Sequence, residues 1–161
     1  MPDEDPALQV IQADARDLAG LVRPQSVDLV VTSPPYWQCR DYGHPRQIGW
    51  EATPEEYVAE LIAALDAWRP LLRPHGSVFL NVGDVFRQGA LVGIPAMIEL
   101  GARANGWRIV NRVIWAKDRG VPEPRPDHFA GRHEYVFQLA LGRHFFLDLH
   151  ALKESLSLIH I

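Results

Sequence analysis

Short apolar runs separated by polar turns predict a series of strands along this chain. Residues 26–32 contain a continuous Leu-Val-Val run, which suits a strand buried on both faces, as in a parallel sheet. Pro34 and Pro35 follow and end that strand, because proline has no N–H to donate to a ladder. Further strands are expected at residues 8–12, 77–82 and 107–115. The last two, at residues 135–141 and 144–147, are expected to pair as a hairpin around Gly142-Arg143.

Two segments have the periodicity of helices. Thr53, Pro54 and Glu56 form a strong start signal, with a cap, a proline at the first helical position and a capping box. The helix is expected to kink or end at Pro70, and a second one is expected at residues 94–105. Strands that alternate with helices and then end in a hairpin predict an α/β domain with a mixed sheet. The apolar stripe of the first helix consists of Val58, Leu61, Ile62, Leu65, Trp68 and Leu72.

Composition places the chain among soluble globular domains. Its 161 residues are 47% hydrophobic and 22% charged, enough for one domain with a real core. The sequence has no membrane-spanning run, an acidic N-terminus unlike a signal peptide, and Cys39 as its single cysteine, so a cytoplasmic setting is expected. The histidines lack the spacing of metal ligands, so no metal site is expected.

The charge distribution leaves a nucleic-acid partner open. The net charge of −4 is not typical of a DNA-binding domain. Residues 101–145, however, carry eight basic side chains against four acidic ones. This segment either faces phosphates or consists of solvated arginines, and the sequence does not decide between the two.

The turn after the buried strand has an unusual hydrogen-bonding character. Open α/β sheets bind their ligands at the carboxyl ends of strands, which is where Ser33-Pro34-Pro35-Tyr36 lies. The two prolines remove amide donors and leave the Ser33 hydroxyl and the Pro34 carbonyl as rigid acceptors. Two acceptors can hold both N–H groups of an exocyclic amine on a base, and Tyr36 offers a flat surface for stacking. The pattern therefore favours chemistry on a base amino group.

The segment Thr32-Ser33-Pro34-Pro35-Tyr36-Trp37 resembles motif IV of the DNA amino-methyltransferases. The resemblance implies a class I S-adenosylmethionine-dependent (Rossmann-like) fold, S-adenosylmethionine as methyl donor, and double-stranded DNA with a flipped target base, in a prokaryotic or phage setting. Serine at the first position favours cytosine N4 over adenine N6. Carbon-5 chemistry is rejected because Cys39 has no adjacent proline. The likeness continues through Leu71–Ser77, Trp115-Ala116-Lys117, Pro122, Pro126, Arg132-His133-Glu134 and Phe145–Asp148.

The resemblance assigns roles to a few residues. Ser33, Pro34, Pro35 and Tyr36 are the expected catalytic residues, with Tyr36 and Trp37 contacting the base. The alternatives are a plain turn serine at Ser33 and core packing at Tyr36 or Trp37. Asp14 matches the family's Gly-Asp element, although Ala13 replaces the glycine. It is expected either on the cofactor side or as the cap of a helix-like stretch.

The sequence allows two roles for each of the polar residues near the strand ends. Asn81 and Asp84 either line the cleft or, as preferred, cap a loop or turn. The tripeptide Arg132-His133-Glu134 either contacts DNA or cofactor or, as preferred, forms an ion pair at a strand start.

The family's glycine-rich cofactor loop, of the Asp-x-Phe-x-Gly-x-Gly type, is absent from this sequence. In the circularly permuted order, with the catalytic motif first, that loop follows the last hairpin. Residues 1–155 are therefore expected to be the N-terminal catalytic part of a C-terminally truncated enzyme, with residues 156–161 as a non-native tail. Three rivals remain: an adenine-N6 enzyme, a protein-glutamine or RNA methyltransferase, and an inactive fragment or half of a split enzyme.

Overall fold

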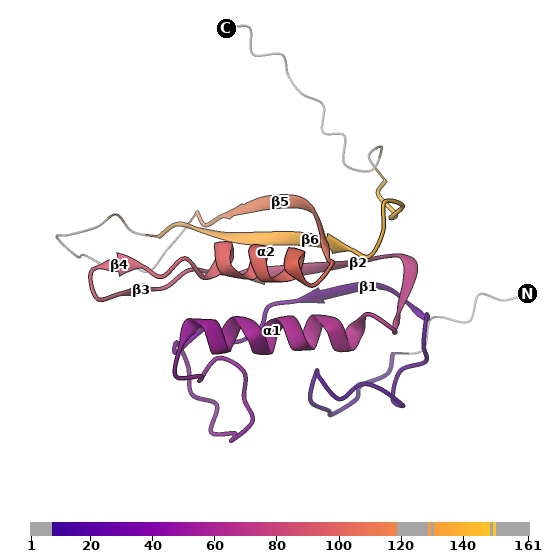
Figure 1. The fold of residues 1–161 in the computed structure, drawn as a ribbon, viewed down its shortest axis with the longest axis horizontal. Coiled ribbons are helices and arrows are strands. Elements are labelled where there is room, and N and C mark those ends of the chain that lie inside the picture. The colour runs from indigo at the N-terminus through magenta and orange to yellow at the C-terminus, as the bar shows by residue number, and fades with distance from the viewer. Residues whose placement is uncertain (1–7, 119–128, 130, 149, 151–161) are drawn as a thin grey trace, which may run out of the picture.

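Four strands form one mixed sheet in the computed structural model, which describes residues 8–118, 129, 131–148 and 150. The strand order is β1 (Val27–Thr32), β2 (Leu72–Val82), β6 (His133–Ala140) and β5 (Arg108–Ala116) (Figure 1). β1 runs parallel to β2, whereas β6 is antiparallel to both β2 and β5. A separate small hairpin joins β3 (Phe86–Arg87) to β4 (Ala90–Leu91).

Two helices pack against each other and against this sheet. α1 (Pro54–Trp68) begins with the predicted capping box of Thr53 and Glu56 and ends before Pro70. α2 (Ile94–Ala104) also begins close to its predicted position. Their apolar faces bury Leu65 and Ile98 in one core with residues of β2 and β6. Figure 1 shows α1 beside β1 and α2 in front of β6 and β2.

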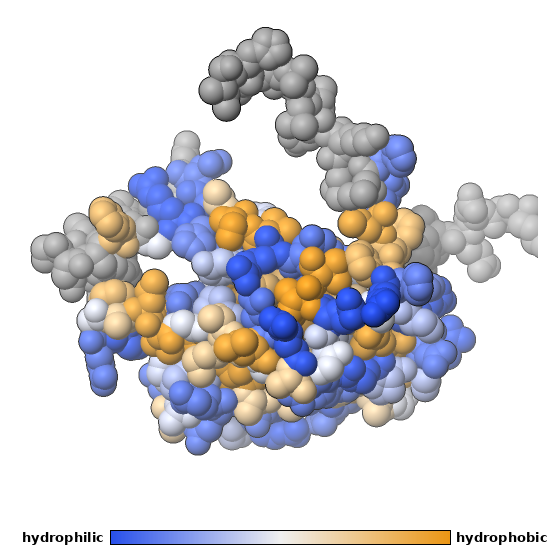
Figure 2. Space-filling model, turned by 45° about the horizontal axis from the view of Figure 1, so that its top comes forward, coloured by the Kyte–Doolittle hydropathy of each residue, from blue (hydrophilic) through white to orange (hydrophobic). Residues whose placement is uncertain are grey.

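The two outer strands carry exposed apolar side chains. The expected burial of β1 on both faces is wrong: it is an edge strand among the described residues, and Leu29 is 53% and Val31 is 73% exposed. On β5, at the other edge, Val113, Ile114 and Trp115 are also exposed. Apolar side chains reach the surface in several patches in Figure 2. Such an uncovered, apolar strand edge is a template for pairing with another segment.

The predicted terminal hairpin is wrong, because β6 pairs with β2 and β5 and not with residues 144–147. β6 lies between β2 and β5, so both of its edges are already hydrogen-bonded. Residues 144–148 therefore have no free edge of β6 to pair with and form no strand. The antiparallel partner that precedes β6 in the chain is β5. The sheet is thus mixed, as expected, but by a different pairing.

Two further strand predictions need correction. Residues 8–12 form no strand, and Leu8 and Val10 are exposed, because the free edge of β1 is not paired with them. β2 begins five residues earlier than expected, at Leu72, which pairs with Val27 before the register shifts. The tail at residues 156–161 lies outside the described residues. No helix within the described part of the chain is long and apolar enough to cross a membrane.

Candidate active site

The Ser33–Tyr36 turn lies at one end of the sheet together with three other strand ends. β1 and β2 are parallel, so their carboxyl ends meet at this edge, where Thr32 pairs with Leu80. β6 is antiparallel, so its first residues come to the same edge, and Val82 pairs with Tyr135. Lys117 follows the end of β5, and its amide donates to the Arg132 carbonyl at 2.8 Å. Residues distant in sequence therefore surround the turn.

The backbone of the turn is held from the core side. The buried Tyr57 hydroxyl donates to the Pro35 carbonyl at 3.0 Å, and burial raises the pKa of that hydroxyl. Gly49 has a φ of +102°, and a Cβ added there would lie 3.0 Å from the Pro35 carbonyl oxygen. Trp37 is 8% exposed and its Nε1–H donates to the Glu51 carbonyl at 3.0 Å. Of the two interpretations of Trp37, core packing is the one this geometry favours.

The outer side of the turn carries two acceptors. Ser33 is exposed, whereas Pro34 and Pro35 are half-buried. The Pro34 carbonyl accepts no hydrogen bond within the described part of the chain, unlike the neighbouring Pro35 carbonyl, which Tyr57 occupies. The prolines prevent the turn from rearranging to bury these oxygens. The turn therefore holds, in a fixed frame, the hydroxyl of an exposed serine and a carbonyl that has no hydrogen-bond donor in the described part of the chain.

Tyr36 packs between the turn and the start of the loop after β2. A Cβ added at Gly83 would lie 2.8 Å from Cε2 of Tyr36, so the ring touches the glycine backbone. The Tyr36 hydroxyl accepts from Asn81 Nδ2 at 3.1 Å, and the Glu134 carboxylate lies beside it. Burial first, and then the adjacent carboxylate, raise the pKa of Tyr36 to about 12. The phenol thus stays protonated and able to donate at neutral pH.

A carboxylate completes this group of side chains. Glu134 accepts from Asn81 Nδ2 at 2.9 Å and forms an ion pair with Lys117. Burial alone would raise the pKa of the Glu134 carboxyl, but the hydrogen bonds from Lys117, Asn81 and Tyr36 outweigh it and lower that pKa. Glu134 is therefore ionised at neutral pH. The preferred ion-pair interpretation of Glu134 holds, but the same carboxylate also reaches the turn.

Two polar residues after β2 have different roles. Asp84 Oδ1 accepts from the amides of Val85, Gly93 and Ile94, which satisfies the start of α2. The predicted capping role of Asp84 is thus confirmed. The preferred turn role of Asn81 is wrong, since its Nδ2 lies 3.4 Å from Ser33 Oγ and contacts Tyr36 and Glu134. Only the pairing of β1, β2 and β6 brings these side chains together, so no local pattern could have identified them.

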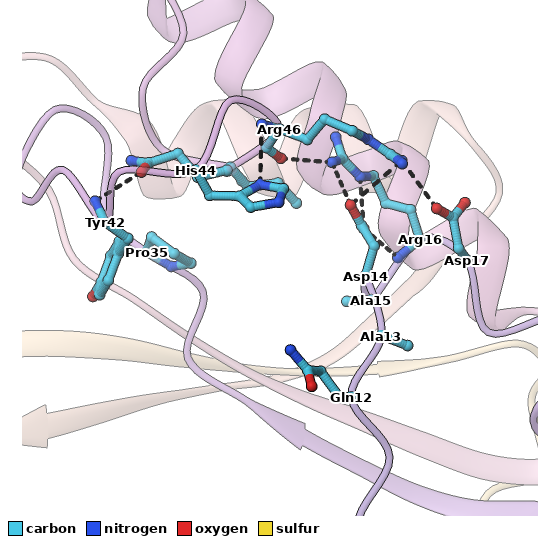
Figure 3. Close-up of a pocket in the computed structure, with 12 residues that line it drawn as sticks. Gln12, Ala13, Asp14, Ala15, Arg16, Asp17, Pro35, Tyr42, His44 and Arg46 are labelled. Atoms are coloured by element: carbon cyan, nitrogen blue, oxygen red, sulfur yellow. Dashed lines mark hydrogen bonds and ion pairs between the residues drawn. The ribbon is translucent and has the colours of Figure 1, made fainter.

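A cavity of about 620 Å³ lies on the other side of the turn. Figure 3 shows Pro35 and Tyr42 on one side of this space, Asp14 and Arg16 on the other, and Gln12 between them. The cavity is therefore lined both by the Ser33–Tyr36 turn, through Pro35, and by the segment around Asp14 that was predicted on the cofactor side.

Asp14 is held by two arginines at the rim of this cavity. Arg16 donates from Nε to Oδ1 at 2.9 Å and from Nη2 to Oδ2 at 2.7 Å, and Arg46 lies 3.4 Å from Oδ2. These bonds, with that from the Arg16 amide, hold the pKa of Asp14 well below its usual range. Residues 15–16 form a turn, so Asp14 is not the cap of a helix.

Comparison with known proteins decides the family. A sequence model of the family described as DNA methylase (N6_N4_Mtase) matches residues 27–157. The chain belongs to this DNA methylase family. Curated relatives of the methylase chain include the type II methyltransferase M.SmaI of Serratia marcescens, which is 29% identical over 92% of this chain. The type II methyltransferase M.MwoI of Methanothermobacter wolfeii is 33% identical over 80% of this chain.

Solved structures give the fold of the methylase chain. The PvuII DNA methyltransferase, described as cytosine-N4-specific, superposes with a TM-score of 0.75 over 89% of this chain at 19% identity. TTHA0409 of Thermus thermophilus, solved complexed with S-adenosyl-L-methionine, gives a TM-score of 0.61 over 85% of this chain at 28% identity. The fold is thus the class I S-adenosylmethionine-dependent methyltransferase fold, with a mixed sheet.

The methylase chain matches only part of these proteins. It covers 61% of M.SmaI, 20% of M.MwoI and 52% of the PvuII enzyme. Among the residues that the structure describes, no group of three or more His, Cys, Asp or Glu side chains could hold a metal ion.

Proposed function

We propose that this chain is the catalytic part of a DNA methyltransferase that transfers a methyl group from S-adenosylmethionine to N4 of cytosine. The observation that carries this proposal is a pair of adjacent acceptors, the exposed Ser33 hydroxyl and the Pro34 carbonyl without a donor in the described part of the chain, on a turn that Tyr57 holds through the Pro35 carbonyl. Membership of the DNA methylase family supports the reaction class. The cytosine-N4 specificity of the structurally similar PvuII enzyme supports the choice of base.

The reaction does not require covalent catalysis by the protein. An exocyclic amine is a weak nucleophile because its lone pair is delocalised into the base. Ser33 and Pro34 each accept one N–H of that amine, which turns the lone pair out of the ring plane and fixes its direction. No covalent enzyme intermediate is needed, and catalysis is mostly positioning. The rigid prolines suit this role because they lose little conformational entropy when the base binds.

The base must leave the duplex to reach these acceptors. Flipping it costs a few kcal/mol. Stacking on one aromatic ring such as Tyr36 returns about 1–3 kcal/mol. Tyr36 is half-buried and held by Gly83 and Asn81, so the ring is already ordered before a base binds. An ordered ring loses less entropy on binding than a free one.

The methyl donor requires a second surface. S-adenosylmethionine, when bound, supplies an electrophilic methyl group. The cavity of about 620 Å³ between Asp14 and Pro35 lies in the usual size range of small-molecule sites, which is roughly 300–1,000 Å³. Gln12 and Asp14 are the residues of this chain that would hold the donor there. A glycine-rich cofactor loop, which the sequence lacks, would complete the site from a segment beyond residue 155 in a permuted enzyme or from a partner chain.

Nucleoside analysis tests this proposal directly. DNA is incubated with S-adenosylmethionine and the protein that carries this chain, then digested and analysed by mass spectrometry. N4-methylcytosine is the expected product. N6-methyladenine would move the assignment to the adenine rival, and methylated protein or RNA with unmodified DNA would overturn the DNA proposal.

A serine variant tests the role of the turn. Ser33→Ala should lower turnover at least about tenfold while DNA affinity stays within about twofold, because a transition-state contact lowers kcat rather than binding. Ser26→Ala is a matched control at the other end of β1, where the Ser26 hydroxyl donates to the Arg23 carbonyl. Equal activity of Ser33→Ala and wild type would refute the role of the hydroxyl.

A further inference from the structure

We propose that Glu134 is a positioning residue for the catalytic turn: its carboxylate fixes the side chain of Asn81 and, through Asn81, the hydroxyls of Tyr36 and Ser33. The inference rests on the proposed function, because it assumes that Ser33 and Tyr36 contact the target base. Glu134 itself belongs to β6, which begins 97 residues after Tyr36 in sequence.

The orientation of the Asn81 carboxamide is the first step of the argument. Its Nδ2 faces three acceptors, Glu134 Oε2 at 2.9 Å, Tyr36 Oη at 3.1 Å and Ser33 Oγ at 3.4 Å. Its Oδ1 is buried and has no hydrogen-bond partner among the described residues. A buried acceptor without a partner is unfavourable, so another interaction must hold the amide in this orientation.

The Glu134 carboxylate supplies that interaction. If the carboxamide turned over, Oδ1 would face the carboxylate, and two acceptors in contact would repel each other. In the observed orientation the N–H group donates to a charged acceptor, which is the stronger kind of hydrogen bond. Lys117 keeps Glu134 ionised and in place through their ion pair. The ion pair between β5 and β6 thus selects one of two amide orientations beside the turn.

The selected orientation determines what Ser33 can offer a base. A hydroxyl has two acceptor lone pairs and one proton. Asn81 Nδ2 lies within reach of one lone pair of Ser33, which leaves the second lone pair for an amino N–H of the target. A reversed Asn81 would present Oδ1 instead, draw the Ser33 proton toward itself and so turn the lone pairs of the hydroxyl into other directions. Glu134 therefore acts on the reaction without touching the base.

A spectroscopic test on the 161-residue chain addresses the positioning itself. The side-chain amide resonances of Asn81, assigned with Asn81→Ser, and the Tyr36 phenol, assigned with Tyr36→Phe, are followed by NMR in wild type and Glu134→Gln. We expect Glu134→Gln to shift the Asn81 amide resonances and to lower the Tyr36 pKa from about 12. Glu134→Asp retains the charge, so it should leave the Asn81 amide resonances and the Tyr36 pKa closer to their wild-type values than Glu134→Gln does. Unchanged Asn81 and Tyr36 signals in Glu134→Gln would overturn the proposal.

The Arg112–Glu99 ion pair offers a matched control. The Glu99 side chain is 18% exposed and that of Glu134 is 15% exposed, and each carboxylate has one basic partner. Glu99→Gln removes the same charge between α2 and β5, away from the turn. It should leave the Asn81 and Tyr36 signals where they are. If it moves them as much as Glu134→Gln does, the effect is general destabilisation and the proposal fails.

Turnover measurements separate positioning from a merely structural role. Glu134→Gln should lower kcat roughly tenfold to a hundredfold with little change in KM, because misplacing an acceptor slightly is sufficient for such a loss. In an Asn81→Ala/Tyr36→Phe background, the same change should lower kcat no further. A full additional loss there would overturn the proposal. If wild type methylates no base but the NMR signals respond, the proposed function fails and the positioning role stands.

Discussion

The ring of Tyr36 lies directly against the backbone of Gly83, with no space for even one methyl group between them. A Cβ built on Gly83 would be 2.8 Å from Cε2, 3.3 Å from Cδ2 and 3.4 Å from Cζ of that ring. The ring cannot simply move aside, because Asn81 holds its hydroxyl and Glu134 in turn holds Asn81. The glycine after β2 therefore sets the position of the aromatic residue in the Ser33–Tyr36 turn.

Gly83→Ala should displace Tyr36 and lower methyl transfer at least about tenfold, since a small displacement of a positioning group is costly in rate. Overpacking a filled site should also lower the free energy of unfolding by about 1–3 kcal/mol. Gly142→Ala is a suitable control, because a Cβ at Gly142 meets no atom within 4 Å. Methylation rates and urea unfolding curves of the two variants provide the comparison. Full activity of Gly83→Ala would contradict the proposed importance of the ring position.

The hydrogen bond from Tyr57 to Pro35 makes a second prediction. Tyr57→Phe leaves the Pro35 carbonyl without its buried donor and should destabilise the fold by about 1–3 kcal/mol. Tyr42→Phe, which alters a tyrosine that is 58% exposed, should change stability far less. Urea denaturation followed by tryptophan fluorescence measures both. Equal midpoints of Tyr57→Phe and wild type would mean that the turn does not need this support.

The pH dependence of stability tests the ion pairs around Asp14. The hydrogen bonds from Arg16 hold the pKa of folded Asp14 well below its usual 3.8, so folding favours the carboxylate. The stabilisation is fully present above the unfolded pKa and is lost as pH falls through the folded one. Asp14→Asn should therefore be less stable than wild type at neutral pH, and the difference should shrink as pH falls below about 4.

Unfolding of wild type and Asp14→Asn at pH 7 and pH 3 measures this difference. Asp41→Asn serves as the control, because Asp41 belongs to no ion pair in the described part of the chain. A difference between wild type and Asp14→Asn that stays constant with pH would show that the charge of Asp14 contributes nothing.

Cofactor binding is expected to be weak in this chain by itself. Calorimetric titration of S-adenosylmethionine should not reach saturation at about 1 mM, which corresponds to less than about 4 kcal/mol of binding free energy. The reason is that the sequence lacks a glycine-rich loop, while β1 leaves Leu29 and Val31 uncovered where further structure can pair. Saturable binding at micromolar concentration would contradict this and would mean that the cavity beside Asp14 suffices.

The amino-acid sequence by itself determined the local features of the site. The proline pair ends β1, and Thr53, Pro54 and Glu56 start α1, because each depends on neighbours within a few residues. The resemblance of the Ser33–Tyr36 turn to a methyltransferase motif gave the family, which the family match confirmed. A loop or turn cap was also predicted at Asp84, although the Gly93 amide from which it accepts lies nine residues away in sequence.

Only the tertiary structure decided which polar residues accompany the turn. Asn81 and Glu134 are 53 residues apart, and each has an ordinary structural role available in sequence. They meet Ser33 and Tyr36 because β6 inserts between β2 and β5, a pairing that local alternation does not specify. The same insertion occupied both edges of β6 and excluded the predicted hairpin. Steric effects and hydrogen bonds between near neighbours can thus be predicted from the sequence. The partner of a strand cannot, because all strands of the sheet compete to pair with one another.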